Sequence, residues 1–386
     1  MFRFEKPYSI EELKEKLLIY QGYADYFSDP VFVTHRKWDG VDFYQSVKAH
    51  LDDAKAYISK KELYLGHKGA SLQRVPDILE VYDSCLDVIL LGLQGKRSSA
   101  YKLFEKKIGS RLNAHFFTFR DQPGDPRFDR DKKTNAYRIR SGSYDSNYSR
   151  KDLFHIPFEL NYLIENNRFS LSGFPCLYMS NSVYGAWEEL NRPIIDECYV
   201  SRLDLSKLSF IDLSQTGAEI TQRLKNHLIF LNKQENPVSE ELVERFEYYL
   251  VDYLYLWPLI LCSSFKVKNN ATFKPEYIFP QIIMEWLVSS ELCLVDGVKF
   301  LSTKLLALDG QLEERAHALA KNYVIPVRQY SNSGFCAECV DKIALTTPVN
   351  YSLSTDSCFP KTKYADTVFS KIEGILESKE LKNIEL

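Results

Sequence analysis

The chain has 386 residues, of which 45% are hydrophobic and 14% aromatic, so it is long enough to bury a sizeable core in more than one domain. Its formal net charge is −3, which argues against the basic surface that nucleic-acid-binding proteins present to phosphates. The longest apolar stretch, LDVILLGLQG, is too short to span a bilayer, and the first residues lack the pattern of a signal peptide. We therefore expect a cytoplasmic protein with neither a nucleic acid nor a membrane as its partner.

The eight cysteines are scattered along the chain, which is typical of reduced thiols rather than of a disulfide framework. Cys336 and Cys339, in CAEC, have the one spacing that resembles a metal site. A second CxxC and a histidine pair at zinc-like distance are both missing from the sequence. We expect no metal ion.

The first part of the chain, to about residue 110, has the apolar spacing of helices. Ser9 and Glu12 have the pattern of a capping box ahead of the first helix. Two further helical runs begin near Val41 and Val75, and a glycine closes the second. Residues 121–135, DQPGDPRFDRDKKTN, are polar and rich in turn formers, so they mark the best boundary. We predict a helical N-terminal region over residues 1–125.

After this boundary, short strands and helices alternate. The predicted strands are AYRIRSG, PCLYMS, CYVSRLDL, SFIDLS, PLILCSSFKV and the end of VDGVKFLSTK. The predicted helices are SVYGAWEEL, SEELVERFEYYLVDYLYLW and PEYIFPQIIMEWLV. This interleaving predicts an α+β domain with a mixed sheet over residues 130–350. Residues 351–386 form a C-terminal extension that ends in a charged amphipathic tail.

Three segments contain the polar residues of a candidate site. They are YRIR with Tyr137, Arg138 and Arg140; residues 167–190 (NRFSLSGFPCLYMSNSVYGAWEEL) with Arg168, Tyr178, Ser180, Glu188 and Glu189; and LILCSSF with Ser263 and Ser264. An arginine fork suits a pyrophosphate, and a tyrosine can stack on a flat heteroaromatic ring. A carboxylate beside a sugar carbon stabilises an oxocarbenium-like centre, and a serine orients a ribose hydroxyl or an amide. Together these residue types describe a pocket for a dinucleotide whose N-glycosidic bond is broken.

These three segments, in this order, resemble the RES domain, a family named for its Arg, Glu and Ser. The resemblance covers residues 135–350 and is strongest over 168–190. It implies a fold related to ADP-ribosyltransferases and enzymes that degrade NAD⁺, with NAD⁺ as the substrate. Many members of the family are toxins paired with an antitoxin that carries a DNA-binding domain. Phe169 stands where many members have Trp, and the first 120 residues are additional to the minimal toxin.

Carried over residue by residue, the resemblance assigns two sets of residues. The catalytic set is Arg168, Glu189 and Ser264, and the NAD⁺-binding set is Tyr137, Arg138, Tyr178, Ser180 and Ser263. The spacing after Trp187 favours Glu189 over Glu188. The end of a predicted strand favours Ser264 over Ser263. Both alternatives stay open.

Structural roles compete with these assignments. Arg138 and Arg140 could alternate out of a strand to the surface, and Tyr178 could be a buried core residue. Ser180 or Ser182 could serve only as the N-cap of the following helix. His155 is the histidine nearest the motif, and a lone histidine is more often structural than catalytic.

The predicted function is cleavage of the nicotinamide–ribose bond of NAD⁺ by hydrolysis or phosphorolysis, in a toxin with a cognate antitoxin. Two alternatives share the pocket. One is a protein ADP-ribosyltransferase whose N-terminal helices recruit a target. The other is an inactive nucleotide-binding module.

Overall fold

The computed structural model divides the chain into two compact units, each built from two separate stretches. The helical unit is Met1–Phe119 with Gln215–Glu276, and the sheet unit is Arg120–Ser214 with Tyr277–Leu386. The structure describes residues 28, 32, 38, 41–60, 74–114, 120–121, 135–142, 147–232, 240–267, 272–290, 295–304, 319, 321–350, 364 and 367–385. The predicted capping box at Ser9 and Glu12 and most of the predicted boundary at 121–135 lie outside these residues.

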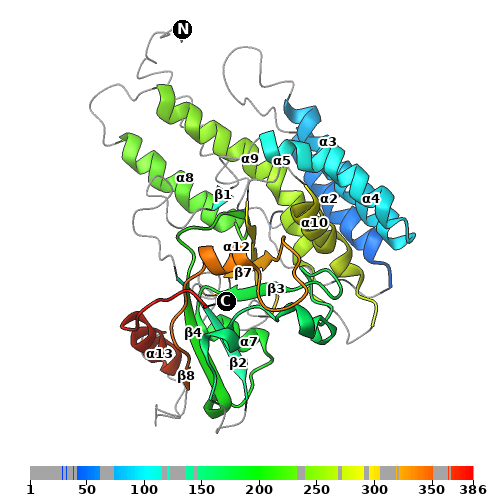
Figure 1. Cartoon of the computed structure of the whole chain (residues 1–386). Coiled ribbons are helices and arrows are strands. Elements are labelled where there is room, and N and C mark those ends of the chain that lie inside the picture. The colour runs from blue at the N-terminus through cyan, green and yellow to red at the C-terminus, as the bar shows by residue number, and fades with distance from the viewer. Residues whose placement is uncertain are drawn as a thin grey trace, which may run out of the picture. The chain divides into compact units, whose positions relative to one another are not determined.

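Helices make up the described part of the first unit (Figure 1). They are α2 (Phe43–Lys60), α3 (Arg74–Leu93), α4 (Arg97–Phe104), the π-helical turn Glu105–Gly109, α5 (Ser110–Ala114), α8 (Gly217–Asn232) and α9 (Glu240–Ser264). Helix α3 lies against α2, α4 and α9. The ring of Trp257 stacks on Tyr82 with centroids 5.7 Å apart, so the core joins the two stretches of this unit.

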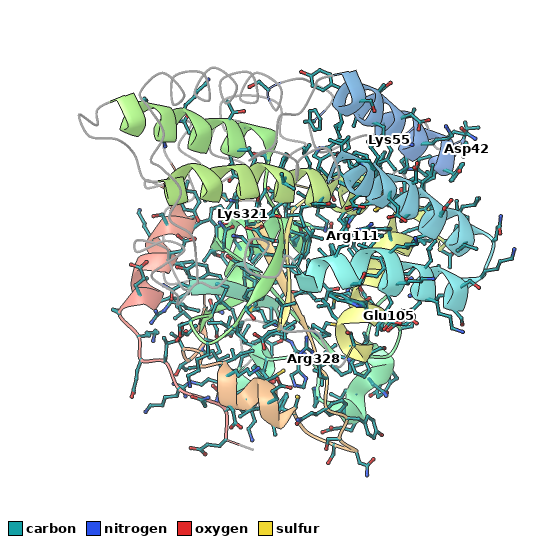
Figure 2. The ribbon with its side chains drawn as sticks, turned by 90° about the horizontal axis from the view of Figure 1, so that it is seen from above. Asp42, Lys55, Glu105, Arg111, Lys321 and Arg328 are labelled. Atoms are coloured by element: carbon teal, nitrogen blue, oxygen red, sulfur yellow. The ribbon has the colours of Figure 1, made fainter. Side chains whose placement is uncertain are left out.

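Ion pairs connect the helices of this unit, and Figure 2 labels one member of each of two pairs, Lys55 and Arg111. Lys55 of α2 pairs with Asp83 of α3, and Arg111 of α5 pairs with Glu80 of α3. Such exposed pairs add little to stability, typically about 0–1 kcal/mol each. The unit therefore depends mainly on its apolar core.

The predicted strand PLILCSSFKV is wrong. Residues 258–264 are the last turns of α9, and the helix continues through Pro258. Leu259, Ile260 and Leu261 are all buried. A continuous apolar run has no period that separates a buried strand from a buried helix, which explains the error. Residues Gln215–Glu276, which the predicted 130–350 domain includes, group with the N-terminal helices.

The second unit is built on a mixed sheet, with eight strands among the described residues. They are β1 (Arg120–Asp121), β2 (Asn135–Ser141), β3 (Cys176–Ser180), β4 (Cys198–Asp204), β5 (Phe210–Leu213), β6 (Gly297–Leu301), β7 (Lys321–Pro326) and β8 (Val349–Asn350). Their order across the sheet is β1-β5-β6-β7-β3-β2-β4-β8. Strands β5 and β6 are parallel, and the other neighbours are antiparallel. The predicted α+β fold with a mixed sheet and a helical N-terminal region is confirmed.

Short helices connect and cover these strands. They are the 3-10 turns Arg150–Leu153, Phe158–Leu163 and Ile195–Glu197, and the α-helices α7 (Val183–Glu189), α10 (Ile278–Ser289), α12 (Ala337–Lys342) and α13 (Val368–Glu377). One more 3-10 turn, Pro275–Tyr277, spans the boundary between the two units. Among the described residues, none of the helices combines the length and apolar character that crossing a bilayer requires.

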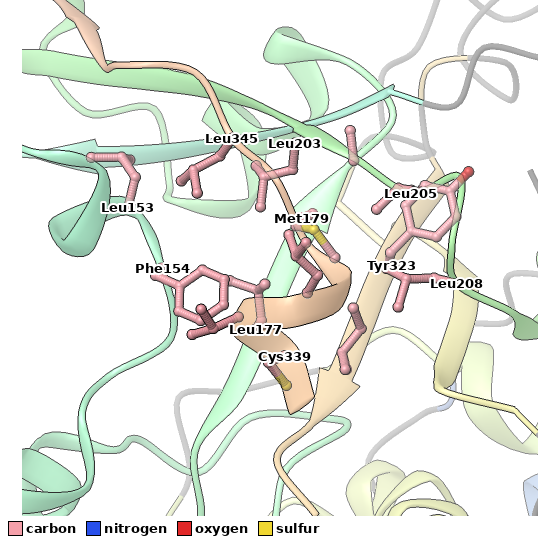
Figure 3. Close-up of a cluster of buried hydrophobic side chains, with 14 of the residues drawn as sticks. Leu153, Phe154, Leu177, Met179, Leu203, Leu205, Leu208, Tyr323, Cys339 and Leu345 are labelled. Carbon is pink, nitrogen blue, oxygen red and sulfur yellow. The ribbon is translucent and has the colours of Figure 1, made fainter. Parts of the chain in front are cut away.

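Each face of the sheet carries its own apolar core, because side chains along a strand alternate between faces. On the face covered by α12, Leu177 and Met179 of β3 lie with Tyr323 of β7 (Figure 3). On the face covered by α7 and α13, Tyr137 of β2 lies in a cluster with Trp187. We call these the α12 face and the α7 face.

Candidate functional site

Arg168 and Glu189 contact one short segment of the sheet unit, residues 302–304, directly after β6. The Nη2 group of Arg168 donates a hydrogen bond to Thr303 Oγ1 at 3.3 Å. The hydroxyl of Ser302 donates to Glu189 Oε1, and the ammonium of Lys304 lies 3.9 Å from Glu189 Oε2. Two predicted site residues of the 167–190 segment, one from the loop before β3 and one from α7, therefore meet directly after β6.

The loop before β3 carries Arg168 and is held from two sides. The guanidinium carbon lies 5.4 Å from the centre of the Tyr277 ring, within the range of a cation–π contact. On the α7 face, the ring of Phe169 lies against Phe300 of β6, with centroids 4.5 Å apart. Arg168 itself is half-buried. The guanidinium thus has a defined position and remains accessible.

Glu189 is the last residue of α7, and its carboxylate receives several donors. Besides Ser302, the side-chain amide of Asn322 donates to Glu189 Oε1 at 2.8 Å. Asn322 comes from β7, and its Oδ1 atom is buried without a hydrogen-bond partner. The Glu189 side chain keeps 35% of its surface exposed, so a ligand can reach it.

Glu188 has a different environment from its neighbour. Its side chain is 5% exposed, and both carboxylate oxygens accept from Nε of Arg192 at 3.0 Å. Glu188 is therefore not the exposed member of the pair. Adjacent helical residues lie about 100° apart, so Glu188 and Glu189 point in different directions. Glu188 points towards Arg192, one turn later in the chain, and forms an ion pair with it.

Helix α7 is fixed at its start by close contacts. Ser182 is the N-cap: its Oγ accepts from the Gly185 amide at 2.9 Å and donates to the Leu319 carbonyl at 2.9 Å. A Cβ atom on Gly185 would lie 2.3 Å from Ser180 Oγ and 2.8 Å from the Leu319 carbonyl. Glycine is therefore required for α7 to approach β3 so closely. Ser180 is buried and donates to the Lys321 carbonyl at 3.4 Å.

Tyr178 lies on the α7 face, and its hydroxyl donates to the Phe169 carbonyl at 2.6 Å. Burial holds the pKa of this phenol well above its ordinary value, so it stays a proton donor. The bond ties β3 to the loop that carries Arg168. Tyr137 is also on this face but is enclosed in the apolar cluster, where its buried hydroxyl has no hydrogen-bond partner.

Arg138 lies on the opposite face from Tyr137. Residues two apart on a strand share a face, and Ala136, two residues before Arg138, belongs to the α12-face core. The Nη1 group of Arg138 donates to the Tyr178 carbonyl at 2.8 Å, and its buried Nε has no partner. Desolvation, with the nearby charge of Arg140, lowers the pKa of Arg138 to about 10, so it remains a cation at neutral pH. A Tyr-Arg pair on one strand presents its two side chains to different faces, and the ligand roles of both residues stay predictions.

Ser263 and Ser264 are at the end of α9 in the helical unit, and both are buried. Ser264 Oγ donates to the Leu261 carbonyl of its own helix at 3.2 Å. The serine that contacts Glu189 is Ser302. The signal that would have found Ser302 is present in GVKFLSTK, where a serine and a threonine directly follow the apolar residues that form the end of β6. No motif in the sequence pointed to Thr303, Lys304, Asn322 or Tyr277 as neighbours of Arg168 or Glu189.

The chemistry of this group of side chains is that of an anion site beside a carboxylate. Arg168 supplies a planar cation, Ser302 and Thr303 supply hydroxyls, and Glu189 supplies a negative charge that a developing cation can face. Within the described ranges, no three histidine, cysteine or acidic side chains are grouped to hold a metal ion.

A protein of Bacillus subtilis (strain 168) named "Putative toxin YopC" is 36% identical to this chain over 216 residues. The matched stretch is 55% of this chain and 45% of that protein, so the chain spans less than half the length of this relative. No family model matches the chain, and no solved structure gives a significant match.

Proposed function

We propose that the sheet unit is a RES-type domain that cleaves the nicotinamide–ribose bond of NAD⁺. The observation that carries the proposal is the convergence of Arg168 and Glu189 on residues 302–304, which follow them in sequence by more than 100 positions. A clamp for phosphate and a carboxylate within one substrate's reach are what this reaction needs. Arg168 in the loop before β3 and Glu189 at the end of α7 are the groups that we assign to these two roles.

In this proposal Arg168 holds the pyrophosphate through two parallel hydrogen bonds. Glu189 faces the positive charge that grows at the anomeric carbon and accepts from the ribose hydroxyls. Ser302 replaces Ser264 as the serine of the site, because it belongs to the same unit and donates to Glu189. Tyr178 ties β3 to the Arg168 loop, and in this proposal it packs near the nicotinamide.

The bond that breaks is the C–N bond between ribose and pyridinium, and its electron pair goes to the nicotinamide nitrogen. Nicotinamide leaves as a neutral molecule, which makes it a good leaving group. A new C–O bond forms to water or to phosphate; water gives up a proton in doing so. A protein side chain in the acceptor position would make the same pocket an ADP-ribosyltransferase.

The relative's name supports a toxin role for this chain. We propose that the toxin acts through loss of cellular NAD⁺ and that its partner is an antitoxin. Expression of the parent chain and of Glu189→Gln in a bacterial host tests this role. We expect growth arrest and a fall in NAD⁺ with the parent alone. Equal growth inhibition by both chains would contradict it.

The chemistry is tested with the purified full chain and NAD⁺, with and without phosphate, and products identified by mass spectrometry. Arg168→Ala and Glu189→Gln should each lower nicotinamide release by about 100-fold or more. Lys207→Ala and Glu197→Gln change an exposed lysine and an exposed glutamate in the same unit and serve as controls for the loss of one positive and one negative charge. Turnover of both site variants within a few-fold of the parent would refute the assignment.

Two further readouts separate the alternatives. Biotinylated NAD⁺ that labels protein, in place of free ADP-ribose products, would identify a transferase. Binding of NAD⁺ by calorimetry without any nicotinamide release would identify an inactive nucleotide-binding module.

A further inference from the structure

The chain passes from the helical unit into the sheet unit between two adjacent residues, Glu276 and Tyr277. Each residue is held within its own unit. The indole Nε1 of Trp38 donates to Glu276 Oε1 at 2.8 Å in the helical unit. In the sheet unit, the ring of Tyr277 lies 5.4 Å from the Arg168 guanidinium carbon. One peptide bond therefore separates an anchor in the helices from a contact to the candidate phosphate-binding arginine.

The anchor on the helical side is firm. Glu276 is buried, and removing the hydrogen-bond donor of a buried carboxylate lowers the free energy of unfolding. Trp38 is itself set edge-on against Phe43, with ring centroids 5.5 Å apart, and Phe43 meets Phe265 in the same way at 5.3 Å. The position of Glu276 is thus fixed by the apolar core of the helical unit.

The contact on the sheet side continues into α10. One turn after Tyr277, the amide of Gln281 donates to Asn166 Oδ1 at 2.6 Å and to the Asn167 carbonyl at 3.4 Å. The start of α10 therefore touches both the side chain of Arg168 and the backbone that precedes it. These contacts lie on two sides of the Arg168 backbone and side chain.

We propose that Tyr277 is a positioning residue for Arg168, and that the Trp38–Glu276 bond sets the position of Tyr277. The helical unit then controls how tightly the sheet unit holds the pyrophosphate of its substrate. This inference rests on the proposed function, because it takes Arg168 as the phosphate ligand. It gives the helical unit a role in substrate affinity rather than in the chemical step.

The test uses the full chain and measures kcat and KM for NAD⁺, the Kd for ADP-ribose, and the melting temperature. Tyr277→Leu removes the ring, and we expect KM and Kd to rise about tenfold with kcat within about twofold. Tyr277→Phe keeps the ring and should behave as the parent does. Tyr330→Leu changes an exposed tyrosine of the same unit and is the matched control. If Tyr277→Leu does not fold, the same constants are measured for Tyr277→Met, which also lacks the ring.

The coupling is tested by Trp38→Phe, which keeps a ring beside Phe43 and removes the indole donor. It should raise KM and Kd in the same direction, and it should add nothing in a Tyr277→Leu background, because both changes act through one contact. Additive effects would overturn the coupling. A Tyr277→Phe chain as impaired as Tyr277→Leu would overturn the ring contact.

The outcomes also separate this inference from the function on which it rests. If the parent binds ADP-ribose and consumes NAD⁺ while Tyr277→Leu has an unchanged KM, the inference fails and the proposed function stands. If the parent neither binds ADP-ribose nor consumes NAD⁺, the proposed function fails and the inference falls with it.

Discussion

Arg168 donates to Thr303 while Glu189 accepts from Ser302, so the guanidinium and the carboxylate are tied to consecutive residues of the chain. Consecutive Cα atoms are about 3.8 Å apart, which keeps the two side chains within the reach of one dinucleotide. The two contacts come from two different elements, the loop before β3 and α7. The adjacent hydroxyls of Ser302 and Thr303 therefore hold the Glu189 carboxylate and the Arg168 guanidinium near each other.

Ser302→Ala should lower NAD⁺ turnover by about 100-fold, because Glu189 loses the hydroxyl that fixes its Oε1 atom. Ser264→Ala removes a hydroxyl that donates only within α9, and we expect turnover within about twofold of the parent. Nicotinamide release by the two purified variants is the measurement. Loss of activity in Ser264→Ala with a native melting temperature would restore Ser264 to the site and remove Ser302 from it.

Glu188→Gln and Glu189→Gln should have opposite effects on stability and activity. Glu188 is a buried partner of Arg192, and its neutralisation should cost about 1–3 kcal/mol in the free energy of unfolding. Glu189 is one-third exposed, so Glu189→Gln should unfold close to the parent midpoint while losing turnover. Urea denaturation and nicotinamide release are measured on both. A stable Glu188→Gln chain without activity would reverse the two roles.

Gly185→Ala should destabilise the protein by about 1–3 kcal/mol, because the new methyl group meets the Leu319 carbonyl and Ser180 Oγ at less than contact distance. Gly374→Ala is the matched change in α13. A Cβ atom there has nothing within 4 Å, so the substitution should stabilise by about 0.5–1 kcal/mol through helix propensity. Thermal melts of both variants test the pair, and a neutral Gly185→Ala would show that α7 can move away from β3.

Stability should fall as the pH is lowered from 6.5 towards 4, in part through His155. Its Nε2 accepts from the Cys336 amide at 3.0 Å and its Nδ1 donates to the Ile156 carbonyl at 2.8 Å, so the folded ring is neutral. Burial lowers the pKa of His155 from 6.5 to about 4, and the charge of Arg138 adds to this effect. Between these two values the unfolded chain binds a proton that the folded chain does not, which favours unfolding.

The full effect is about 3 kcal/mol at pH 4. His155→Gln keeps a hydrogen-bonding side chain without a titrating group, and it should flatten the pH dependence of the unfolding free energy across this window. An unchanged slope in the variant would assign the pH dependence to other groups.

The elements that sequence reasoning found correctly are those with local signals. The α+β class, the strands around Tyr137 and Tyr178 and the helix that carries Glu189 follow from alternating patterns, a serine cap and short runs between turns. These signals depend on near neighbours in the chain. They can therefore be recognised in a single sequence.

What sequence reasoning missed depends on partners distant in the chain. The apolar run that contains Ser264 has no period, so only its packing in the helical unit identifies it as helix. Ser302 and Asn322 are recognised only through Glu189, which lies more than 100 residues away. The opposite directions of Tyr137 and Arg138 follow from strand alternation, and the prediction of one shared pocket for both did not take this into account.

The interleaving of the two units has a consequence for synthesis on the ribosome. The helical unit needs residues as late as Glu276, and the sheet unit is closed by a bridge between Leu345 and Lys382. Arg168 and Glu189 leave the exit tunnel well before the segment at 302–304 that joins them. On the nascent chain, neither side chain can therefore make its contact until residues 302–304 have also left the tunnel.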